Sequence, residues 1–312
     1  MKATRESYGL TVAELGETNK NIVVLDADLS KSTKTEIFGK KFPERFINCG
    51  IAEGNMMSVA AGLAASGKTV FASSFAMFAT GRAYEQIRNS IGYPGLNVKI
   101  AASHAGVSVG EDGATHQCIE DISLMRSIPG MVVVCPADDA QACAAVKVAA
   151  EYEGPMYIRL GRLVFPDVYT PETCNFKLGK GDVIQDGTDV TIVATGLMVS
   201  ESIAAAKLLA DEGISAAVIN ISTIKPIDSE LLEKYARKTG CIVTAEEHSI
   251  IGGLGSAVCE SVSETCPVPV VRVGVNDVFG LSGKAKDVLN YFGLNGENIA
   301  KKAKEAITRK KA

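Results

Sequence analysis

Residues 97–117 read NVKIAASHAGVSVGEDGATHQ, and this stretch decides the fold that we expect for the whole chain. Its first six residues form an apolar run of the kind that makes a buried strand. The remainder, Ser103 to Gln117, carries His104 and His116, two of the three histidines of the chain, together with three glycines. Glycine permits positive φ angles and a close approach of the backbone to a ligand. The pattern therefore predicts a ligand-binding loop at the carboxyl end of a strand in an open α/β sheet.

Strand-like and helix-like segments alternate on both sides of this loop. The apolar runs of the N-terminal half are residues 21–26, 46–49, 68–73, 97–102, 131–135 and 156–160. Those of the C-terminal half are residues 190–195, 216–220, 241–245 and 268–273. Continuous β-branched runs are typical of parallel strands that are buried on both faces. We therefore expect an α/β protein of two domains, each a mainly parallel sheet with helices on both faces.

The alternating pattern fails between the two halves. Pro166, Pro171, Gly179 and Gly181 interrupt a polar stretch there, which is typical of a linker. We therefore expect one domain over residues 1–163, a linker over 164–187 and a second domain over 188–312. A chain of 312 residues is long enough to build two hydrophobic cores.

Composition narrows the class of protein. The chain is 46% hydrophobic and 22% charged, which is typical of a globular protein, and its net charge of −4 gives no basic excess for binding nucleic acid. No apolar run reaches the length of a membrane span, and the N-terminus lacks a signal pattern. Eight cysteines are scattered without a C-x-x-C pair, which favours reduced thiols. We expect a cytoplasmic protein that binds neither nucleic acid nor membranes.

Polar residues follow several strands of the first domain and should meet at one edge of its sheet. Zinc is one chemistry to consider, but the spacing of His104 and His116 matches no compact zinc motif, and we assign no metal ligand. A Ser-His-Asp hydrolase is another, but no G-x-S-x-G elbow follows a strand. In the second domain, His248 follows Glu246 and Glu247, and we expect it to be a hydrogen-bonded structural residue.

Two motifs resemble those of the transketolase family. Residues 45–56, RFINCGIAEGNM, are similar to the segment that leads to the cofactor-activating glutamate, and residues 110–117, GEDGATHQ, look like the transketolase signature. The resemblance continues through residues 136–138 and 160–162 and covers nearly the whole chain. It implies a pyrimidine-binding domain followed by a transketolase C-terminal domain. Nothing resembles the diphosphate-binding domain that normally precedes them, so the chain resembles the C-terminal subunit of a split, two-chain transketolase.

The resemblance implies a role for individual residues. Glu53 would bind the aminopyrimidine of thiamine diphosphate and assist its activation. His104 and His116 would line the substrate channel and help to move protons, which makes these three the implied catalytic residues. The other implied cofactor-binding residues are Phe75, Phe78 and Asp28, and the implied substrate-binding residues are Arg5, Ser32, His104, Asp112 and Arg162.

The implied activity is the transfer of a two-carbon ketol unit, glycolaldehyde, between sugar phosphates, as in the pentose phosphate pathway of carbohydrate metabolism. The cofactor would be shared with an N-terminal transketolase subunit that holds Mg²⁺ or Ca²⁺, in a two-plus-two heterotetramer. Two alternatives stay open. One is another thiamine diphosphate enzyme, such as a deoxyxylulose-phosphate synthase fragment or a 2-oxo acid dehydrogenase β subunit. The other is a non-catalytic binding module derived from the family. Gly81 stands where many transketolases have a third aromatic residue, which implies a looser wall around the pyrimidine, and Ala105 stands where an aspartate is common, so the sugar specificity also stays open.

Overall fold

Both halves of the chain are built around a sheet, as a computed structural model of residues 1–311 shows. The elements of the first half are α1 (Thr4–Thr18), β1 (Ile22–Asp26), α2 (Ser30–Thr33), α3 (Glu36–Lys41), η1 (Pro43–Arg45), β2 (Phe46–Asn48), α4 (Glu53–Ala65), β3 (Thr69–Ser73), η2 (Met77–Arg82), α5 (Tyr84–Gln86), η3 (Ile87–Gly92), β4 (Val98–Ala102), η4 (Val107–Asp112), α6 (Asp121–Ser127), β5 (Val132–Val134), α7 (Asp139–Glu151) and β6 (Met156–Arg159). Those of the second half are β7 (Asp182–Gln185), β8 (Val190–Ala194), α8 (Met198–Asp211), β9 (Ala216–Asn220), β10 (Thr223–Lys225), α9 (Ser229–Thr239), β11 (Ile242–Ser249), α10 (Leu254–Thr265), β12 (Val270–Val275), α11 (Ala285–Tyr291) and α12 (Gly296–Lys311).

The first sheet has the strand order β10-β5-β6-β4-β3-β1-β2. Its strands run parallel except for β10, which pairs antiparallel with β5. Strands β1, β3 and β4 are buried along their whole length, as their continuous apolar runs predict. Helices α1, α3 and α7 pack on one face, whereas α4, α6 and the helical turns η2 and η3 pack on the other.

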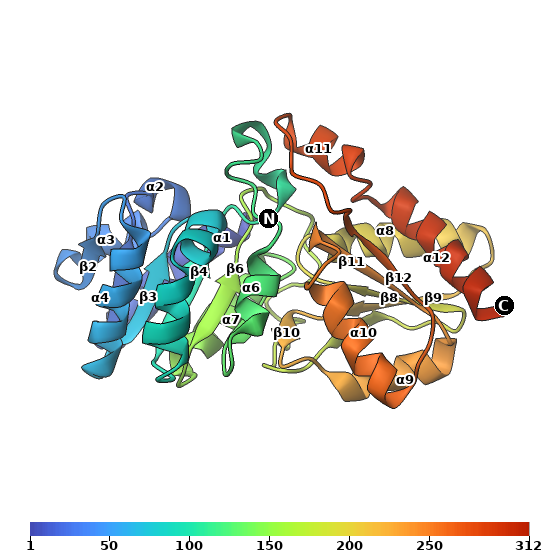
Figure 1. Cartoon of the computed structure of the whole chain (residues 1–312), viewed down its shortest axis with the longest axis horizontal. Coiled ribbons are helices and arrows are strands. Elements are labelled where there is room, and N and C mark those ends of the chain that lie inside the picture. The colour runs from blue at the N-terminus through green and yellow to red at the C-terminus, as the bar shows by residue number, and fades with distance from the viewer. Residues whose placement is uncertain (312) are drawn as a thin grey trace.

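The second sheet has the order β12-β11-β8-β9-β7 and is parallel except for β7. Helices α8 and α12 cover one face, and α9 and α10 cover the other (Figure 1). The predicted fold class, two mainly parallel α/β domains with helices on both faces, is confirmed. No helix within residues 1–311 is long and apolar enough to cross a membrane.

Three parts of the fold differ from the sequence-based expectation. Strand β7 lies inside the predicted linker of residues 164–187, where its largely exposed residues give no buried run. Strand β10 has only three residues, and it extends the sheet of the other domain. The alternating pattern predicts a regular helix between the strand-like runs 68–73 and 97–102, but η2 and η3 are π-type turns on either side of the single turn α5.

The two domains share a hydrophobic core. Met131 and Cys135, which flank β5, belong to the same buried cluster as Ile221 and Leu254 of the second domain. Because this core is continuous and β10 crosses the junction, the domains are held together by more than the chain that connects them.

A buried ion pair fixes the end of β6 to the start of α6. Arg159 Nε donates to Asp121 Oδ2 at 2.7 Å, and Tyr157 Oη donates to the same oxygen at 2.6 Å. The Asp121 side chain is fully buried and that of Arg159 is 6% exposed. The substitution Asp121→Ala would leave a buried guanidinium without a counter-charge, and we expect it to lower the free energy of unfolding by about 3–5 kcal/mol. Urea unfolding at a fixed chain concentration measures this.

The matched control is a pair on the surface. Glu212 accepts from Lys304 Nζ at 2.8 Å, and both side chains are about half exposed. Because solvent screens such a pair, Glu212→Ala should change the free energy of unfolding by less than about 1 kcal/mol. An Asp121→Ala variant as stable as this control would contradict the structural importance of the buried pair.

Candidate active site

The loop of residues 103–117, called the histidine loop here, leaves the carboxyl end of β4 as the sequence predicts. Ser103 forms a parallel bridge with Phe75, which follows β3, and Gly106 N donates to Cys118 O at 2.7 Å. The three glycines of the loop have φ angles of +79°, +81° and +74°, so their predicted use for positive φ is confirmed. The loop is therefore closed on itself and placed beside the end of β3.

His104 is the most tightly held residue of the loop. It has a φ angle of 58°, which is uncommon for a residue with a side chain and is a form of strain often found at functional sites. Its ring stacks on Phe75 with centroids 3.8 Å apart, and its side chain is almost fully buried. Nε2 lies 3.4 Å from Arg5 Nη1 and Nδ1 lies 2.8 Å from Ser103 Oγ. Because a guanidinium can only donate, Nε2 accepts and Nδ1 carries the proton of a neutral ring.

The pKa of His104 also indicates that its imidazole is neutral. Burial, reinforced by the charges of Arg5, Arg162 and His116, lowers the pKa of His104 to about 3. His104 therefore stays uncharged at neutral pH and offers one donor and one acceptor.

His116 lies across the aromatic cluster from His104. Its ring meets Phe78 edge-on at 5.2 Å and Phe75 at 6.3 Å, and the two phenylalanine rings stack at 6.0 Å. Thr115 Oγ1 lies 3.0 Å from His116 Nδ1 and helps to orient the ring. The structure thus brings together both predicted histidines and both predicted aromatic residues, although they are far apart in the sequence.

Glu53 is the first residue of α4, and its side chain is 2% exposed. Its two carboxylate oxygens accept from Arg82 Nη1 at 2.9 and 2.8 Å. The Arg82 guanidinium also lies 4.7 Å from the centroid of Phe78, and its side chain is 53% exposed. The sequence does not predict the pairing of Arg82 with Glu53, because no motif links Arg82 to a glutamate that lies 29 residues earlier.

Two further cations border the cluster. Arg5 donates to the backbone carbonyl of Ser32 at 2.8 Å, and its buried Nε has no partner within residues 1–311. Arg162 donates to the carbonyl of Val109 and lies 3.1 Å from Glu111 Oε2. Burial, and then the charge of Arg162, lowers the pKa of Arg5. Such a pair suits an anion that can accept several hydrogen bonds.

Three predicted residues are less firmly placed at the site. Ser32 contributes its backbone carbonyl to Arg5, and its hydroxyl has no hydrogen bond within the described residues. Asp28, with a φ angle of 64°, and Asp112 are exposed, and neither carboxylate has a side-chain partner in residues 1–311. Neither Asp28 nor Asp112 is held at the aromatic cluster by a side-chain hydrogen bond or ion pair within residues 1–311.

Metal ligands are not grouped in this part of the chain. Within residues 1–311 there is no set of three or more histidine, cysteine, aspartate or glutamate side chains that could hold an ion. The zinc alternative considered from the sequence therefore has no ligand set there.

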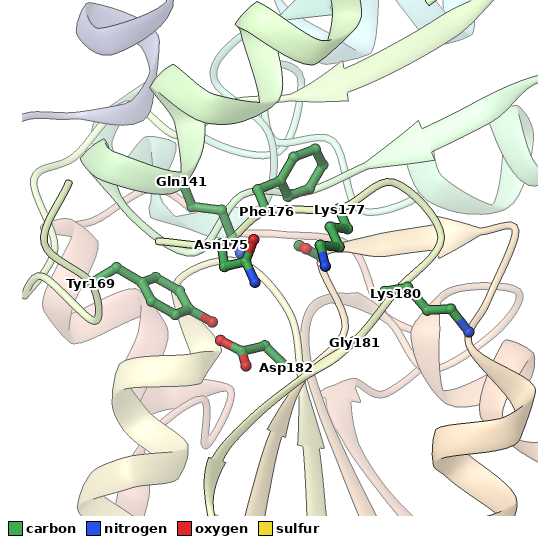
Figure 2. Close-up of a pocket in the computed structure, with 9 residues that line it drawn as sticks. Gln141, Tyr169, Asn175, Phe176, Lys177, Lys180, Gly181 and Asp182 are labelled. Atoms are coloured by element: carbon green, nitrogen blue, oxygen red, sulfur yellow. The ribbon is translucent and has the colours of Figure 1, made fainter. Parts of the chain in front are cut away.

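A separate cavity of about 270 Å³ lies between the linker and both domains. Figure 2 shows Gln141 of α7, Tyr169 and Lys177 of the linker and Asp182 of β7 around it. None of the predicted site residues lines this cavity. The candidate active site is therefore located by the cluster around His104, at the carboxyl ends of β3 and β4.

The chain has two α/β domains, a buried glutamate and an imidazole–phenylalanine cluster at the strand ends. Its similarity to known protein families identifies the class to which it belongs. The chain matches the family "Transketolase, pyrimidine binding domain" over residues 1–167 and "Transketolase, C-terminal domain" over residues 179–299. It belongs to the transketolase family, whose domains imply dependence on thiamine diphosphate.

Relatives of nearly the same length show which part of a transketolase this chain resembles. The chain is 45% identical to one subunit of the 6-deoxy-6-sulfo-D-fructose transketolase of a Clostridium species, covering 98% of this chain and 95% of the relative. It is 41% identical to one subunit of the apulose-4-phosphate transketolase of Phocaeicola vulgatus, covering 99% of each. A solved structure described as a split gene transketolase, inactive beta4 tetramer, is 57% identical and superposes with a TM-score of 0.93, covering 99% of this chain and 100% of the other. The resemblance to the C-terminal subunit of a split transketolase is confirmed.

The low pKa of His104 gives a testable prediction. In NMR spectra of the folded chain, the His104 ring should show no titration between pH 5 and 8, because its pKa is about 3. In the urea-unfolded chain, histidine should titrate near the ordinary value of about 6.5. A His104 titration midpoint above pH 5 in the folded chain would contradict the hydrogen-bond assignment.

The free energy of unfolding should depend on pH because the pKa of His104 is lowered in the folded chain. Between pH 6.5 and about 3 the unfolded chain binds a proton at His104 that the folded chain does not, so the stability contributed by His104 is complete above pH 6.5 and falls as the pH decreases. The variant His104→Asn lacks this proton, so its stability should fall less than that of the wild type between pH 6.5 and 4.5.

Proposed function

We propose that this chain is the C-terminal subunit of a thiamine diphosphate-dependent transketolase that transfers a two-carbon ketol unit between sugar phosphates. It acts together with a separate N-terminal subunit. The observation that carries the proposal is the cluster of Phe75, Phe78, His104 and His116 beside the buried carboxylate of Glu53. Equal-length relatives that are transketolase subunits support the reaction class.

The residues of this half-site fit the cofactor. Glu53 is a buried carboxylate whose partner, Arg82, is half exposed and has room to turn toward solvent. The carboxylate can then accept a hydrogen bond from, or share a proton with, a ring nitrogen. Phe75 and Phe78 give an apolar, aromatic wall for the same ring. Thiamine diphosphate, when bound, supplies the stabilisation of the carbanion that ketol transfer requires.

Imidazoles serve the proton transfers. Neutral His104 presents an acceptor at Nε2 and a donor at Nδ1, so it can orient a substrate hydroxyl without adding charge. His116, partly exposed beside Phe78, can exchange protons with a substrate oxygen. The strained φ of His104 keeps its ring against Phe75, so little reorganisation is needed when substrate enters.

Cations at the rim would bind the phosphate of the sugar. Arg5 contacts His104 and Arg162 contacts the histidine loop at Val109, and both guanidinium groups are donors that suit a phosphate. Ser32 and Asp112 are assigned to the same substrate by family resemblance, with Ser32 next to Arg5 and Asp112 in the histidine loop. Asp28 is assigned to the cofactor on the same basis.

The partner chain would complete the site and hold the metal, Mg²⁺ or Ca²⁺. Ile51, two residues before Glu53, is 78% exposed, and Phe279 of the second domain is 83% exposed next to a cavity lined by Phe78 and Arg82. Exposed apolar side chains of this size around a site are typical of an interface. The 57% identical structure is described as an inactive beta4 tetramer, which supports a chain that is inactive without its partner. We infer a two-plus-two heterotetramer.

The donor sugar is the least constrained part of the proposal. The relatives are named for 6-deoxy-6-sulfo-D-fructose, a sugar sulfonate, and for apulose 4-phosphate, so a role in the pentose phosphate pathway is one of several possible assignments. Cytoplasmic location is proposed from the eight cysteines, all of which are free thiols.

Reconstitution tests the reaction class. This chain is mixed with its proposed partner, a transketolase N-terminal subunit, together with thiamine diphosphate and Mg²⁺, and ketol transfer from xylulose 5-phosphate to ribose 5-phosphate is followed. Apulose 4-phosphate and 6-deoxy-6-sulfo-D-fructose serve as alternative donors. We expect transfer from at least one donor in the mixture and none with either chain alone. Activity of this chain alone, or no transfer with any donor despite cofactor binding, would contradict the proposal.

Glu53→Gln tests the proposed catalytic carboxylate. Removing the charge and the shared proton should lower turnover by about 10²-fold or more while leaving assembly with the partner intact. Glu14→Gln, an exposed carboxylate on α1, is the matched control and should keep full turnover. Size-exclusion chromatography of the mixtures checks assembly. Turnover of Glu53→Gln within twofold of the control would remove Glu53 from the mechanism.

A further inference from the structure

A carboxylate of the second domain supports the histidine loop from behind. Glu247, on β11, is 4% exposed, and its Oε1 accepts from the backbone N–H of Ser108 at 2.5 Å. A Cβ on Gly106 would lie 2.2 Å from the carboxyl carbon of Glu247. The backbone of the loop therefore lies directly on this carboxylate, at a position where only glycine fits.

This contact is close in sequence to the substrate-facing side chain. Gly106 and Ser108 follow His104 by two and four residues, and the same segment is tied to Cys118 by the hydrogen bond from Gly106 N at 2.7 Å. A shift of the loop at Gly106 would therefore move His104 on Phe75. The neighbouring carboxylate of β11 is bound elsewhere: Glu246 accepts from Leu254 N and Gly255 N at the start of α10, at 2.6 and 2.7 Å.

His248 follows Glu247 near the end of β11. Its Nε2 accepts from Ser123 N of α6 at 3.4 Å, its Nδ1 lies 2.8 Å from Ser249 O, and it is fully buried. The prediction that His248 is a hydrogen-bonded structural residue is confirmed.

Charged and titratable groups surround Glu247 on every side. Arg159 of β6 donates to its backbone carbonyl at 2.9 Å and is paired with Asp121 of α6. Glu246 and His248 flank it on β11, and Cys135 shares with it a cavity of about 20 Å³ at the domain junction. Burial raises the pKa of Glu247 to about 7, against the lowering effects of Arg159 and of the Ser108 N–H. The cavity has room for about one water molecule, which could carry a proton to the carboxyl group.

We propose that Glu247 is a positioning residue that holds the histidine loop in its working geometry when ionised and loosens it when protonated. A charged acceptor makes a stronger hydrogen bond than a neutral one, so the Ser108 N–H is held more firmly by the carboxylate than by the acid. The consequence for turnover rests on the proposed function, whereas the loop geometry does not.

Hydrogen–deuterium exchange of the full chain tests the geometric part. Protection of peptides covering residues 103–117, corrected for the intrinsic exchange rate, is measured from pH 6 to 8.5. In the wild type we expect protection to rise about tenfold as pH increases through 7, which is the difference between a neutral and a charge-assisted hydrogen bond. Glu247→Gln keeps an acceptor but cannot ionise, so this rise should disappear.

Glu246→Gln is the matched control, because it removes an adjacent buried carboxylate that contacts α10 instead of the loop. It should change protection at residues 254–258 and leave the pH-dependent rise at 103–117 unchanged. Glu247→Asp keeps the charge but withdraws it by one methylene, so the loop should be less protected at every pH. The proposal is overturned if Glu247→Gln, folded by circular dichroism, keeps the wild-type pH dependence of protection.

The reconstituted enzyme gives the second readout. The kcat/KM of the wild type should rise through about pH 7, and Glu247→Gln should lose that rise while KM for thiamine diphosphate stays within twofold. If the wild type transfers no ketol unit but its loop protection still depends on Glu247, the proposed function fails and the positioning role stands. If transfer is normal and the two pH profiles coincide, the positioning role fails and the function stands.

Discussion

The buried ion pair of Arg159 and Asp121 is the interaction on which the arrangement of the site depends. Arg159 ends strand β6, and Asp121 begins the helix that follows the histidine loop. The same guanidinium reaches the carbonyls of Cys118, at 3.4 Å, and Glu247, at 2.9 Å. One charged group thus joins the first sheet, the far end of the histidine loop and the second domain. The Arg159 guanidinium can be buried at this position only because its counter-ion and its carbonyl acceptors are all present.

With that junction fixed, the chemistry of the site follows from where the strands end. β3 and β4 place Phe75 and His104 in contact, and the turn after Phe75 carries Phe78 to the second histidine. Burial, reinforced by the positive charges of Arg5 and Arg162, keeps the nearby imidazole neutral, and the two arginines offer donors to an anion. The buried carboxylate beside this cluster, Glu53, is balanced by a half-exposed surface cation. The site therefore combines apolar walls, neutral hydrogen-bonding rings and unmatched donors, which suit a large organic cofactor and a phosphorylated sugar.

The strands and the position of the candidate site were predictable because local sequence patterns indicate them. Buried β-branched runs indicated the strands, and the glycine-rich loop between His104 and His116 indicated the position of the site. The edge strand β7 was missed because its residues are largely exposed, and β10 was missed because it has only three residues and is a strand only through its pairing with the other domain. Pairings between distant residues, such as Glu53 with Arg82 and Glu247 with Ser108, leave no trace in spacing. The roles of the predicted catalytic, cofactor-binding and substrate-binding residues and the domain limits at residues 163 and 188 stay predictions.

The central claim is that this chain provides half of a cofactor site. The most direct test is titration calorimetry of thiamine diphosphate, with Mg²⁺ present, into this chain, into the N-terminal subunit and into their mixture. We predict weak or undetectable binding to either chain alone and tight binding to the mixture, with one cofactor for each pair of chains. Tight, stoichiometric binding to this chain by itself would contradict the account, because the aromatic cluster and Glu53 would then be a complete site.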